Sequence, residues 1–292
     1  MNKIKRAAVL VHYDRNDMVD PYVYTYLKAL KPCTSHLVFV STAKLDMKQL
    51  EDLKLICEKV IVRENIGYDF MSYKIGLESF DYTSYDEVLL CNDSVYGPFY
   101  PMTQLFDSMQ SMKCDFWGIT DNSVMGYHLQ SYFMLFKHPV LTSSTFKNFW
   151  KSVKVLPHKS DIIKFYEVGL TKHLMNAGYV PTISTSFKPT FFNNLKIVIL
   201  KLTPKKIIKK ASSLLRKKDT LSNIGKNNST HYFWKELLVE DNMPFVKIEL
   251  LRDNPMQIDI QNIYTIINKI STYDTTLIKN HLARMKGLSN DT

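Results

Sequence analysis

The sequence lacks several features that would assign it to a familiar class. Nine glycines and eleven prolines in 292 residues exclude collagen-like and low-complexity chains. No apolar run approaches the roughly 18 residues that a membrane-spanning helix requires. The four cysteines, at positions 33, 57, 91 and 114, have neither CxxC nor metal-finger spacing, so we expect free thiols. With 45% hydrophobic and 23% charged residues, the chain is globular and long enough for one large or two modest domains.

Four common catalytic motifs are also missing. The sequence contains no GxGxxG, GxxxxGK[ST], GxSxG or HExxH, which disfavours a nicotinamide site, a P-loop, a hydrolase serine elbow and a zinc protease. The basic N-terminus is followed by an apolar stretch of Ala7 to Val11 only, too short for a secretory signal. We therefore expect a cytoplasmic protein.

Acidic residues are absent from one strongly basic segment. Nine Lys and Arg residues lie between Lys196 and Lys218, and they account for nearly all of the formal net charge of +10. From Pro204 onward the apolar residues have helical spacing, with Lys205, Lys206, Lys209 and Lys210 among the basic ones. A basic amphipathic helix is typical of proteins that bind anionic membranes, where each lysine contributes about 1 kcal/mol.

Two other interpretations of this segment remain open. It would also suit an ordinary surface helix that packs its apolar stripe on the core. Nucleic-acid binding is disfavoured, because no aromatic residues alternate with the lysines to stack on bases.

We expect peripheral association with the inner face of the cell membrane. We also expect three regions: a catalytic domain (1–190), the basic segment (191–222) and a C-terminal extension (223–292) that packs on that domain.

The first 120 residues alternate between strand and helix patterns. Short apolar runs predict strands at 7–11, 37–40, 60–62, 87–91 and 116–119, and helical spacing predicts helices at 20–30, 46–57 and 70–78. This order is typical of an α/β fold with a mostly parallel central sheet flanked by helices. Ligands bind at the carboxyl ends of the strands in such sheets.

Three polar loops follow predicted strands. They begin at His12, Arg63 and Asn92, and each is rich in turn-forming residues. Because parallel strands end at one edge of a sheet, we expect these loops to converge on a binding site. The candidates from these loops are His12, Arg63, Asn65, Gly67, Asp69, Asn92, Asp93 and Ser94.

Several short motifs together resemble the rhamnan synthesis protein F family, which are bacterial glycosyltransferases of surface polysaccharide assembly. The resemblance runs from about the first strand to Pro255. Its motifs are RENIGYD (63–69), LLCNDS (89–94), DFWGIT (115–120), HLQSYF (128–133), THYFWKEL (230–237), PFVK (244–247) and LLRDNP (250–255). It implies a GT-A-like (Rossmann-like) fold and a nucleotide-sugar donor.

The same resemblance implies roles for individual residues. In GT-A enzymes an acidic motif after the fourth strand holds a divalent metal, Mg²⁺ or Mn²⁺. The corresponding residues here are Asn92-Asp93-Ser94, with one acid where the usual motif has two, so metal dependence stays open. Mg²⁺ needs few protein carboxylates. His128 is a candidate diphosphate ligand or a buried histidine, and Trp117 a stacking or a core residue.

The segment Tyr166 to Tyr179 is similar to the catalytic-base element of inverting GT-A enzymes, in which acids open a helix. Glu167 matches the catalytic acid of that element, and Tyr166 replaces the first acid of the pair. We expect a helix from about Glu167 to Gly178, closed by that glycine in the left-handed conformation. A helix-capping role for Glu167 is the alternative, with Asp115 and Asp121 as the next candidate bases.

The sequence thus predicts an inverting rhamnosyltransferase that uses dTDP-rhamnose to extend a polyprenyl-diphosphate-linked glycan, with no nucleic-acid partner. A different nucleotide sugar, or a catalytically silent scaffold at the membrane surface, are the alternatives. The single acid in residues 92–94 is the feature that favours the scaffold.

Overall fold

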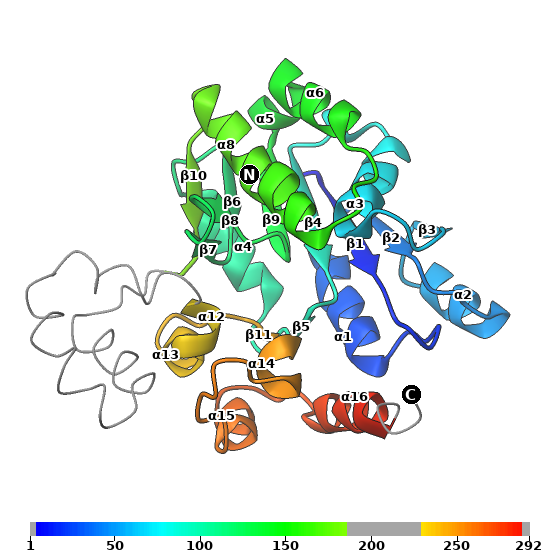
Figure 1. Cartoon of the computed structure of the whole chain (residues 1–292), viewed down its shortest axis with the longest axis vertical. Helices are drawn as coiled ribbons and strands as arrows, with labels where there is room; N and C mark the ends of the chain where they lie inside the picture. The colour runs from blue at the N-terminus through cyan, green and yellow to red at the C-terminus, as the bar shows by residue number, and fades with distance from the viewer. Residues whose placement is uncertain (1–3, 186–228, 288–292) are drawn as a thin grey trace, which may run out of the picture.

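The computed structural model describes residues 4–185 and 229–287. A seven-stranded sheet forms its centre, in the order β10-β6-β9-β4-β1-β2-β3 (Figure 1). The strands are β1 (Arg6–His12), β2 (His36–Ser41), β3 (Lys59–Val62), β4 (Glu87–Asn92), β6 (Phe116–Gly118), β9 (Phe133–Lys137) and β10 (Pro181–Ile183). All neighbours pair in parallel except β9, which is antiparallel to β4 and to β6. The predicted mostly parallel sheet is therefore confirmed, whereas β9 and β10 were not predicted.

Helices cover both faces of this sheet. Those of the first 185 residues are α1 (Pro21–Leu30), α2 (Met47–Lys54), α3 (Tyr68–Glu78), α4 (Met102–Gln110), α5 (His138–Thr142), α6 (Ser144–Ser152), α7 (Lys159–Ile162) and α8 (Val168–Asn176). The helices predicted at 20–30, 46–57 and 70–78 correspond to α1, α2 and α3. Asp46 caps α2 by accepting a 2.7 Å hydrogen bond from the backbone N–H of Gln49.

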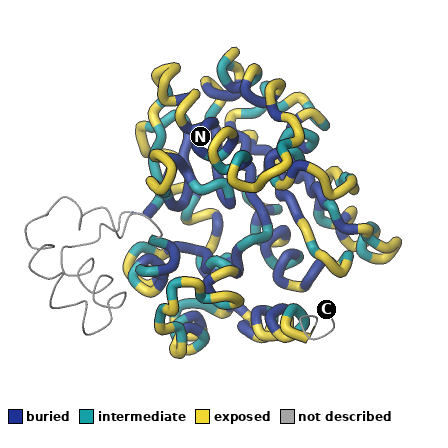
Figure 2. Tube along the Cα trace, viewed as in Figure 1, coloured by how far each residue is buried: buried dark blue, intermediate teal, exposed yellow. Residues whose placement is uncertain are grey.

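Alternation of side chains along each strand divides the core into two layers. In β1, Ala8 and Leu10 belong to the core beneath α1 and α4, whereas Ala7 and Val9 belong to the core beneath α3, α5, α6 and α8. Both faces are covered, so β1 is a continuous apolar run, dark blue in Figure 2. Helix α3 lies close to the sheet at Gly76, where an added Cβ would be 2.3 Å from Cγ1 of Val9.

The C-terminal residues pack against the α1 side of the sheet (Figure 1). They form α12 (Ser229–Tyr232), α13 (Trp234–Val239), β11 (Val246–Lys247), α14 (Ile248–Arg252), α15 (Ile263–Ile270) and α16 (Thr276–Gly287). Strand β11 pairs antiparallel with β5 (Val95–Tyr96), directly after β4. The ring centroids of Phe245 and Tyr26 lie 4.9 Å apart, with the rings tilted by 58°, so the two parts share one core.

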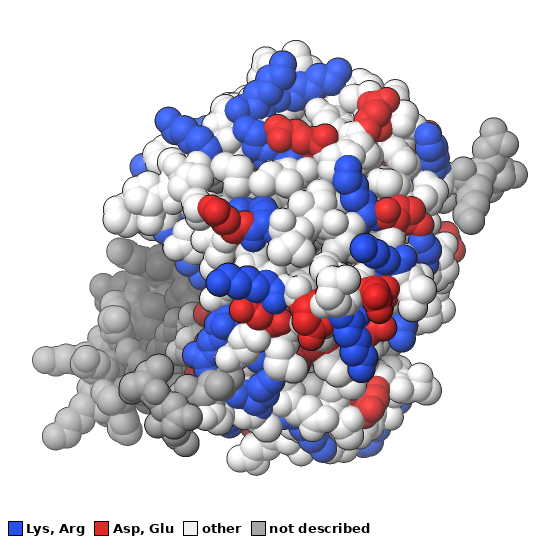
Figure 3. All heavy atoms as spheres, turned by 90° about the vertical axis from the view of Figure 1, so that its right-hand side faces the viewer, with Lys and Arg blue, Asp and Glu red and all other residues white. Residues whose placement is uncertain are grey.

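The predicted basic segment, with Lys205, Lys206, Lys209 and Lys210, lies outside the described residues, and the three predicted regions stay a prediction. Among residues 4–185 and 229–287, no helix is both long and apolar enough to cross a bilayer. On the face in Figure 3, acidic and basic side chains lie side by side in a band across the middle.

Candidate active site

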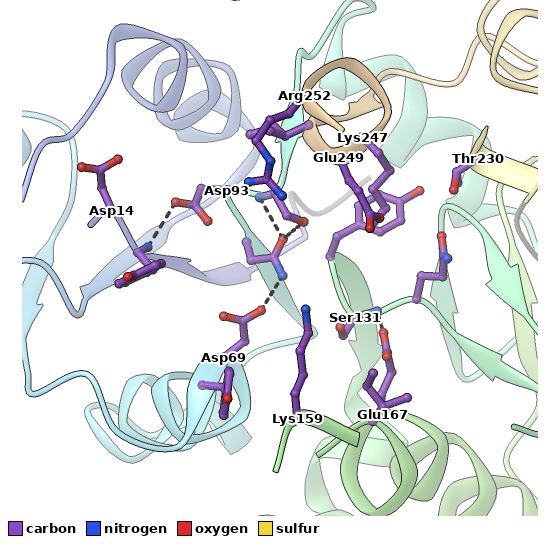
Figure 4. A pocket seen from close by; sticks show the side chains of 18 of the residues that line it. Asp14, Asp69, Asp93, Ser131, Lys159, Glu167, Thr230, Lys247, Glu249 and Arg252 are labelled. Atoms are coloured by element: carbon purple, nitrogen blue, oxygen red, sulfur yellow. Dashed lines mark hydrogen bonds between the residues drawn. The ribbon is translucent and has the colours of Figure 1, made fainter. Parts of the chain in front are cut away.

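A cavity of about 690 Å³ opens at the carboxyl ends of β1 and β4. Its walls come from the loops after these strands, from the helix that carries Glu167, and from the C-terminal segment (Figure 4). A second cavity of about 500 Å³ adjoins it over the ends of β1, β2 and β3. Tyr13, Asp14 and Arg15 line both cavities, so the loop after β1 forms a shared wall.

Asp93 is held at the cavity wall by the loop after β1. Its Oδ2 accepts a 3.1 Å hydrogen bond from the backbone N–H of Tyr13, and Nε2 of His12 lies 3.8 Å from the same oxygen. Burial and the nearby Asp69 carboxylate raise the pKa of Asp93 well above its ordinary value. A cationic ligand would relieve this cost, so Asp93 is suited to bind positive charge.

His12 lies behind Asp93 rather than in the cavity wall. It is 4% exposed, and its Nδ1 shares a 2.9 Å hydrogen bond with Oγ of Ser41. Burial lowers the pKa of His12 to about 4, although Asp14 raises it. The imidazole is therefore neutral at pH 7 and supports Asp93 instead of contacting a ligand.

Asn92 connects the end of β4 to the start of α3. Its Nδ2 donates a 2.9 Å hydrogen bond to Oδ2 of Asp69, and its Oδ1 accepts from the N–H and hydroxyl of Ser94 at 3.2 and 2.6 Å (Figure 4). Burial raises the pKa of Asp69. Asp69, Asn92, Asp93 and Ser94 all line the cavity, so the structure brings this predicted group together.

Arg63 organises the loop between β3 and α3. Its guanidinium donates hydrogen bonds to the carbonyl oxygens of Glu64 and Ile66 and to Oγ of Ser72. Gly67 ends this loop at φ 82°, where an added Cβ would lie 3.0 Å from Cβ of Met71. Arg63 and Asn65 line the second cavity and not the first. The sequence pattern predicted one binding site and did not distinguish the two cavities.

Glu167 lies in the cavity wall on a different helix from the acids of the β4 edge (Figure 4). Its Oε1 accepts a 2.8 Å hydrogen bond from the backbone N–H of Ser131. The predicted helix start at Glu167 is wrong, because α7 begins at Lys159 and continues through a π-helical turn, Ile163–Glu167, into α8. Glu167 is thus inside a helix, and π turns of this kind are frequent at functional sites. The predicted helix end is confirmed, since Gly178 has φ 91°.

Two predicted ligands lie away from the cavity. Trp117 is 1% exposed and packs against Phe106 and Phe133 in the core. His128 is 3% exposed, and its Nδ1 shares a 2.8 Å hydrogen bond with the carbonyl of Gly126. The structure thus favours the core interpretation of both residues. Trp117 lies in β6 of the central sheet, and His128 lies in β8 (His128–Leu129), where its ring is hydrogen-bonded to a neighbouring carbonyl.

The two reserve candidates for the base lie elsewhere as well. Asp115 precedes β6 at its amino end, and its Oδ2 accepts a 2.8 Å hydrogen bond from the N–H of Val180. Since β6 and β4 run in the same direction, Asp115 lies at the opposite edge of the sheet from the cavity. Asp121, in β7 (Asp121–Asn122), lines neither cavity.

The C-terminal segment contributes charged groups that the sequence analysis did not select. Lys247, Glu249 and Arg252 line the cavity, together with Lys159 from α7 and His231 from α12. Lys247 follows Phe245 and Val246, which are 0% and 1% exposed. The PFVK motif that contains Lys247 was the available signal in the sequence, but a motif does not reveal which cavity the lysine faces.

One cluster has the residue types of a metal site. Asp14, Asp20 and His281 place one ligand atom each within 4.8 Å of one another. Arg284 already donates hydrogen bonds to both carboxylates, so a guanidinium neutralises this cluster and a divalent ion does not fit. Asp93 in the cavity wall fits better as a ligand of Mg²⁺ or Mn²⁺, because its carboxylate is partly buried beside a second acid and faces the cavity.

Comparison with known proteins assigns the family. The family model of rhamnan synthesis protein F matches residues 37–232, which include the β4 edge and most of the cavity wall. The chain belongs to this family. The virulence protein VirA of Vibrio anguillarum is 31% identical over 217 residues, which cover 70% of the chain and 66% of VirA. The protein y4gN of Sinorhizobium fredii is 28% identical over 188 residues, covering 62% of the chain and 48% of y4gN. The chain therefore spans less than two thirds of these relatives.

Solved structures align with the chain at low similarity. The glycosyltransferase GlyE of Streptococcus pneumoniae aligns with 97% of the chain and 64% of its own length, at a TM-score of 0.46 and 13% identity. Glucosyl-3-phosphoglycerate synthase of Mycobacterium tuberculosis, in complex with Mn²⁺, UDP and phosphoglyceric acid, aligns with 63% of the chain and 82% of its length, at 0.37 and 9%. Scores this low carry no argument about the activity of this chain.

Proposed function

We propose that this member of the rhamnan synthesis protein F family is a nucleotide-sugar-dependent glycosyltransferase. The observation that carries the proposal is a single cavity with Asp93 at the end of β4 and Glu167 on a separate wall. Sites at the carboxyl ends of parallel strands suit nucleotides. The second cavity, at the ends of β1, β2 and β3, offers space for the nucleoside beside the first.

The reaction follows from the groups in this cavity. The acceptor hydroxyl oxygen forms a bond to the anomeric carbon of the donor, the bond from that carbon to the diphosphate oxygen breaks, and the electron pair leaves with the diphosphate. Glu167 accepts the hydroxyl proton, as a general base must within hydrogen-bond reach. Attack from the face opposite the leaving group inverts the anomeric carbon. A bound Mg²⁺ or Mn²⁺ would supply Lewis-acid stabilisation of the diphosphate, and Asp93 would hold it.

The family description, rhamnan synthesis protein F, supports rhamnose as the transferred sugar. Our proposal takes dTDP-rhamnose as the donor and a polyprenyl-diphosphate-linked glycan as the acceptor. The basic residues Lys205, Lys206, Lys209 and Lys210 would bind the anionic surface that carries such an acceptor, at the inner face of the membrane. With a different donor sugar, the contacts to the sugar would differ, but the proposed roles of Asp93 and Glu167 would be the same.

Donor hydrolysis tests the proposal. The purified chain is incubated with dTDP-rhamnose and a panel of other nucleotide sugars, with Mg²⁺, Mn²⁺ or EDTA, and released nucleoside diphosphate is measured. We expect release from one donor and its loss in Asp93→Asn. If no donor is hydrolysed or raises the melting temperature, the silent-scaffold alternative replaces the proposal.

A further inference from the structure

Lys247 occupies a fixed position beside the end of β4. It pairs with Val95 of β5 in the antiparallel β5–β11 ladder, and the N–H of the next residue, Ile248, donates a 3.0 Å hydrogen bond to the carbonyl of Ser94. The ladder therefore attaches Lys247 to the strand that follows Asn92-Asp93-Ser94. This pairing crosses about 150 positions of sequence and brings an ammonium group to the acidic edge of the sheet.

The ammonium of Lys247 has acids around it, but within residues 4–185 and 229–287 it forms no close ion pair and no side-chain hydrogen bond. Its Nζ lies 3.9 Å from the centroid of the Tyr132 ring. Tyr132 itself is fixed, because its hydroxyl and that of Thr120 are hydrogen-bonded at 2.9 Å. The ring face holds the cation electrostatically but leaves its N–H donors free for a ligand.

Charged and titratable groups from several elements surround this ammonium. They are Glu167 of the π-helical turn, Asp69 of α3, Glu249 of α14, Lys159 of α7 and His231 of α12. Burial lowers the pKa of Lys247 to about 8, and the three acids raise it. Lys247 is thus charged at pH 7 at a cost that an anionic ligand would repay.

The neighbouring cations are less suited to the same role. Arg252 donates hydrogen bonds from Nη2 and Nε to the carboxylate of Asp253, at 2.7 and 2.9 Å. Lys159 is solvent-exposed on a four-residue helix. Residues 92–94 supply a single acid for a metal, so charge on a departing diphosphate needs compensation from another source.

We propose that Lys247 binds the diphosphate of the nucleotide donor and stabilises the negative charge that develops on it as it leaves. This assignment rests on the proposed function and adds the C-terminal segment to the catalytic machinery. Residues of the first 185 positions would bind the nucleoside and activate the acceptor, and β11 would complete the site for the leaving group.

Nucleotide binding by the full chain tests the assignment. Isothermal titration with dTDP, dTMP, UDP and UMP is carried out at pH 7 on the wild type, Lys247→Met and Lys247→Arg. The matched control is Lys279→Met, because Lys279 lies over the Tyr264 ring at 5.1 Å on α16 but does not line the cavity. We expect Lys247→Met to weaken nucleoside diphosphate binding by about 10-fold or more and monophosphate binding much less, and Lys247→Arg to retain most affinity.

A pH series separates this role from a structural one. In the wild type, affinity for the diphosphate should fall as pH rises from 7 to 9, because the ammonium loses its proton, whereas Lys247→Arg should keep its affinity over that range. Equal diphosphate affinity of Lys247→Met and wild type would overturn the assignment and leave the proposed function standing. If the wild type binds neither dTDP nor UDP, dTDP-rhamnose is excluded as the donor, and the proposed function in that form fails together with the assignment.

Discussion

Arg284 in the last helix donates a 2.6 Å hydrogen bond from Nη2 to Oδ2 of Asp14, 270 positions away in the loop after β1. The same guanidinium donates to Asp20 and Asn16, and Arg15 donates in return to the carbonyl of Met285 at 3.1 Å. This loop forms the wall shared by the two cavities. Helix α16 therefore holds in place the loop that separates the two cavities.

Removal of this guanidinium should destabilise the fold. We expect Arg284→Met to lower the free energy of unfolding by about 3 kcal/mol, because two partly buried carboxylates lose their cation. Urea denaturation measures the change. Arg252→Met is the control: Arg252 and Asp253 are 40% and 47% exposed, so less than about 1 kcal/mol should be lost. Equal losses in the two variants would contradict this prediction.

The same pair predicts how stability depends on pH. Although burial raises the pKa of Asp14, hydrogen bonds from Arg284 and the backbone hold it below its ordinary value of 3.8. An acid with a lowered native pKa stabilises the fold above its unfolded pKa and loses that contribution as pH falls through the native value. The stability difference between wild type and Asp14→Asn should therefore be constant from pH 5 to 7 and shrink below about pH 4. A difference that persists at pH 2 would argue against the ion pair.

Asp93→Asn should remove activity without weakening the fold. Because burial and Asp69 raise the pKa of Asp93, its charged form is unfavourable in the folded protein at pH 7. The neutral amide removes that cost, and its oxygen still accepts from the N–H of Tyr13. We expect donor hydrolysis to be lost while the melting temperature stays equal or rises. Full activity in the variant would exclude Asp93 from the site.

Glu167→Gln should reduce the turnover rate by about 10²–10⁴-fold. The amide oxygen can still accept from the N–H of Ser131, so donor affinity and thermal stability should be nearly unchanged. Asp115→Asn is the control, since Asp115 lies at the opposite edge of the sheet, and its rate should match the wild type. A stable Glu167→Gln protein with wild-type turnover would show that another group accepts the proton.

Substitution of Lys205, Lys206, Lys209 and Lys210 by Gln should reduce binding to anionic liposomes. Added salt should mimic the change, because the attraction is electrostatic and screened. In the control variant, four exposed lysines of the described surface are replaced by Gln, so that it loses the same formal charge. They are Lys48, Lys54, Lys113 and Lys172. If both variants partition alike, the basic segment has no special role at the membrane.

Much of the fold could be predicted from local patterns. Residues 7–11 and 88–91 are all apolar because both faces of β1 and β4 are covered, and such burial can be recognised in the sequence. Strands β9 and β10 were not predicted: β10 has only three residues, and the sequence around β9 does not show that it inserts antiparallel between β4 and β6. The helix around Glu167 was placed too late, because a π turn preserves helical backbone without a start signal.

Local sequence patterns were enough to predict the edge of the sheet at which the first cavity lies and most of the acidic residues that line it. His12, Asp69, Asn92 and Asp93 follow or face strand ends, and parallel strands bring such ends together whatever their separation. The patterns did not decide whether His12, Trp117 and His128 point into the cavity or into the core, because both environments accept the same residue types.

The positions of the basic residues around the cavity follow from long-range packing. Lys247 reaches the cavity through the β5–β11 ladder, and Arg284 reaches Asp14 through the packing of α16 on α1. Contacts of this range depend on how a whole segment docks, and no residue spacing near Lys247 or Arg284 encodes their partners. The partners of a charged side chain depend on which groups the fold brings near it in space. The conformation of a strand or a turn depends mainly on residues that are close in sequence.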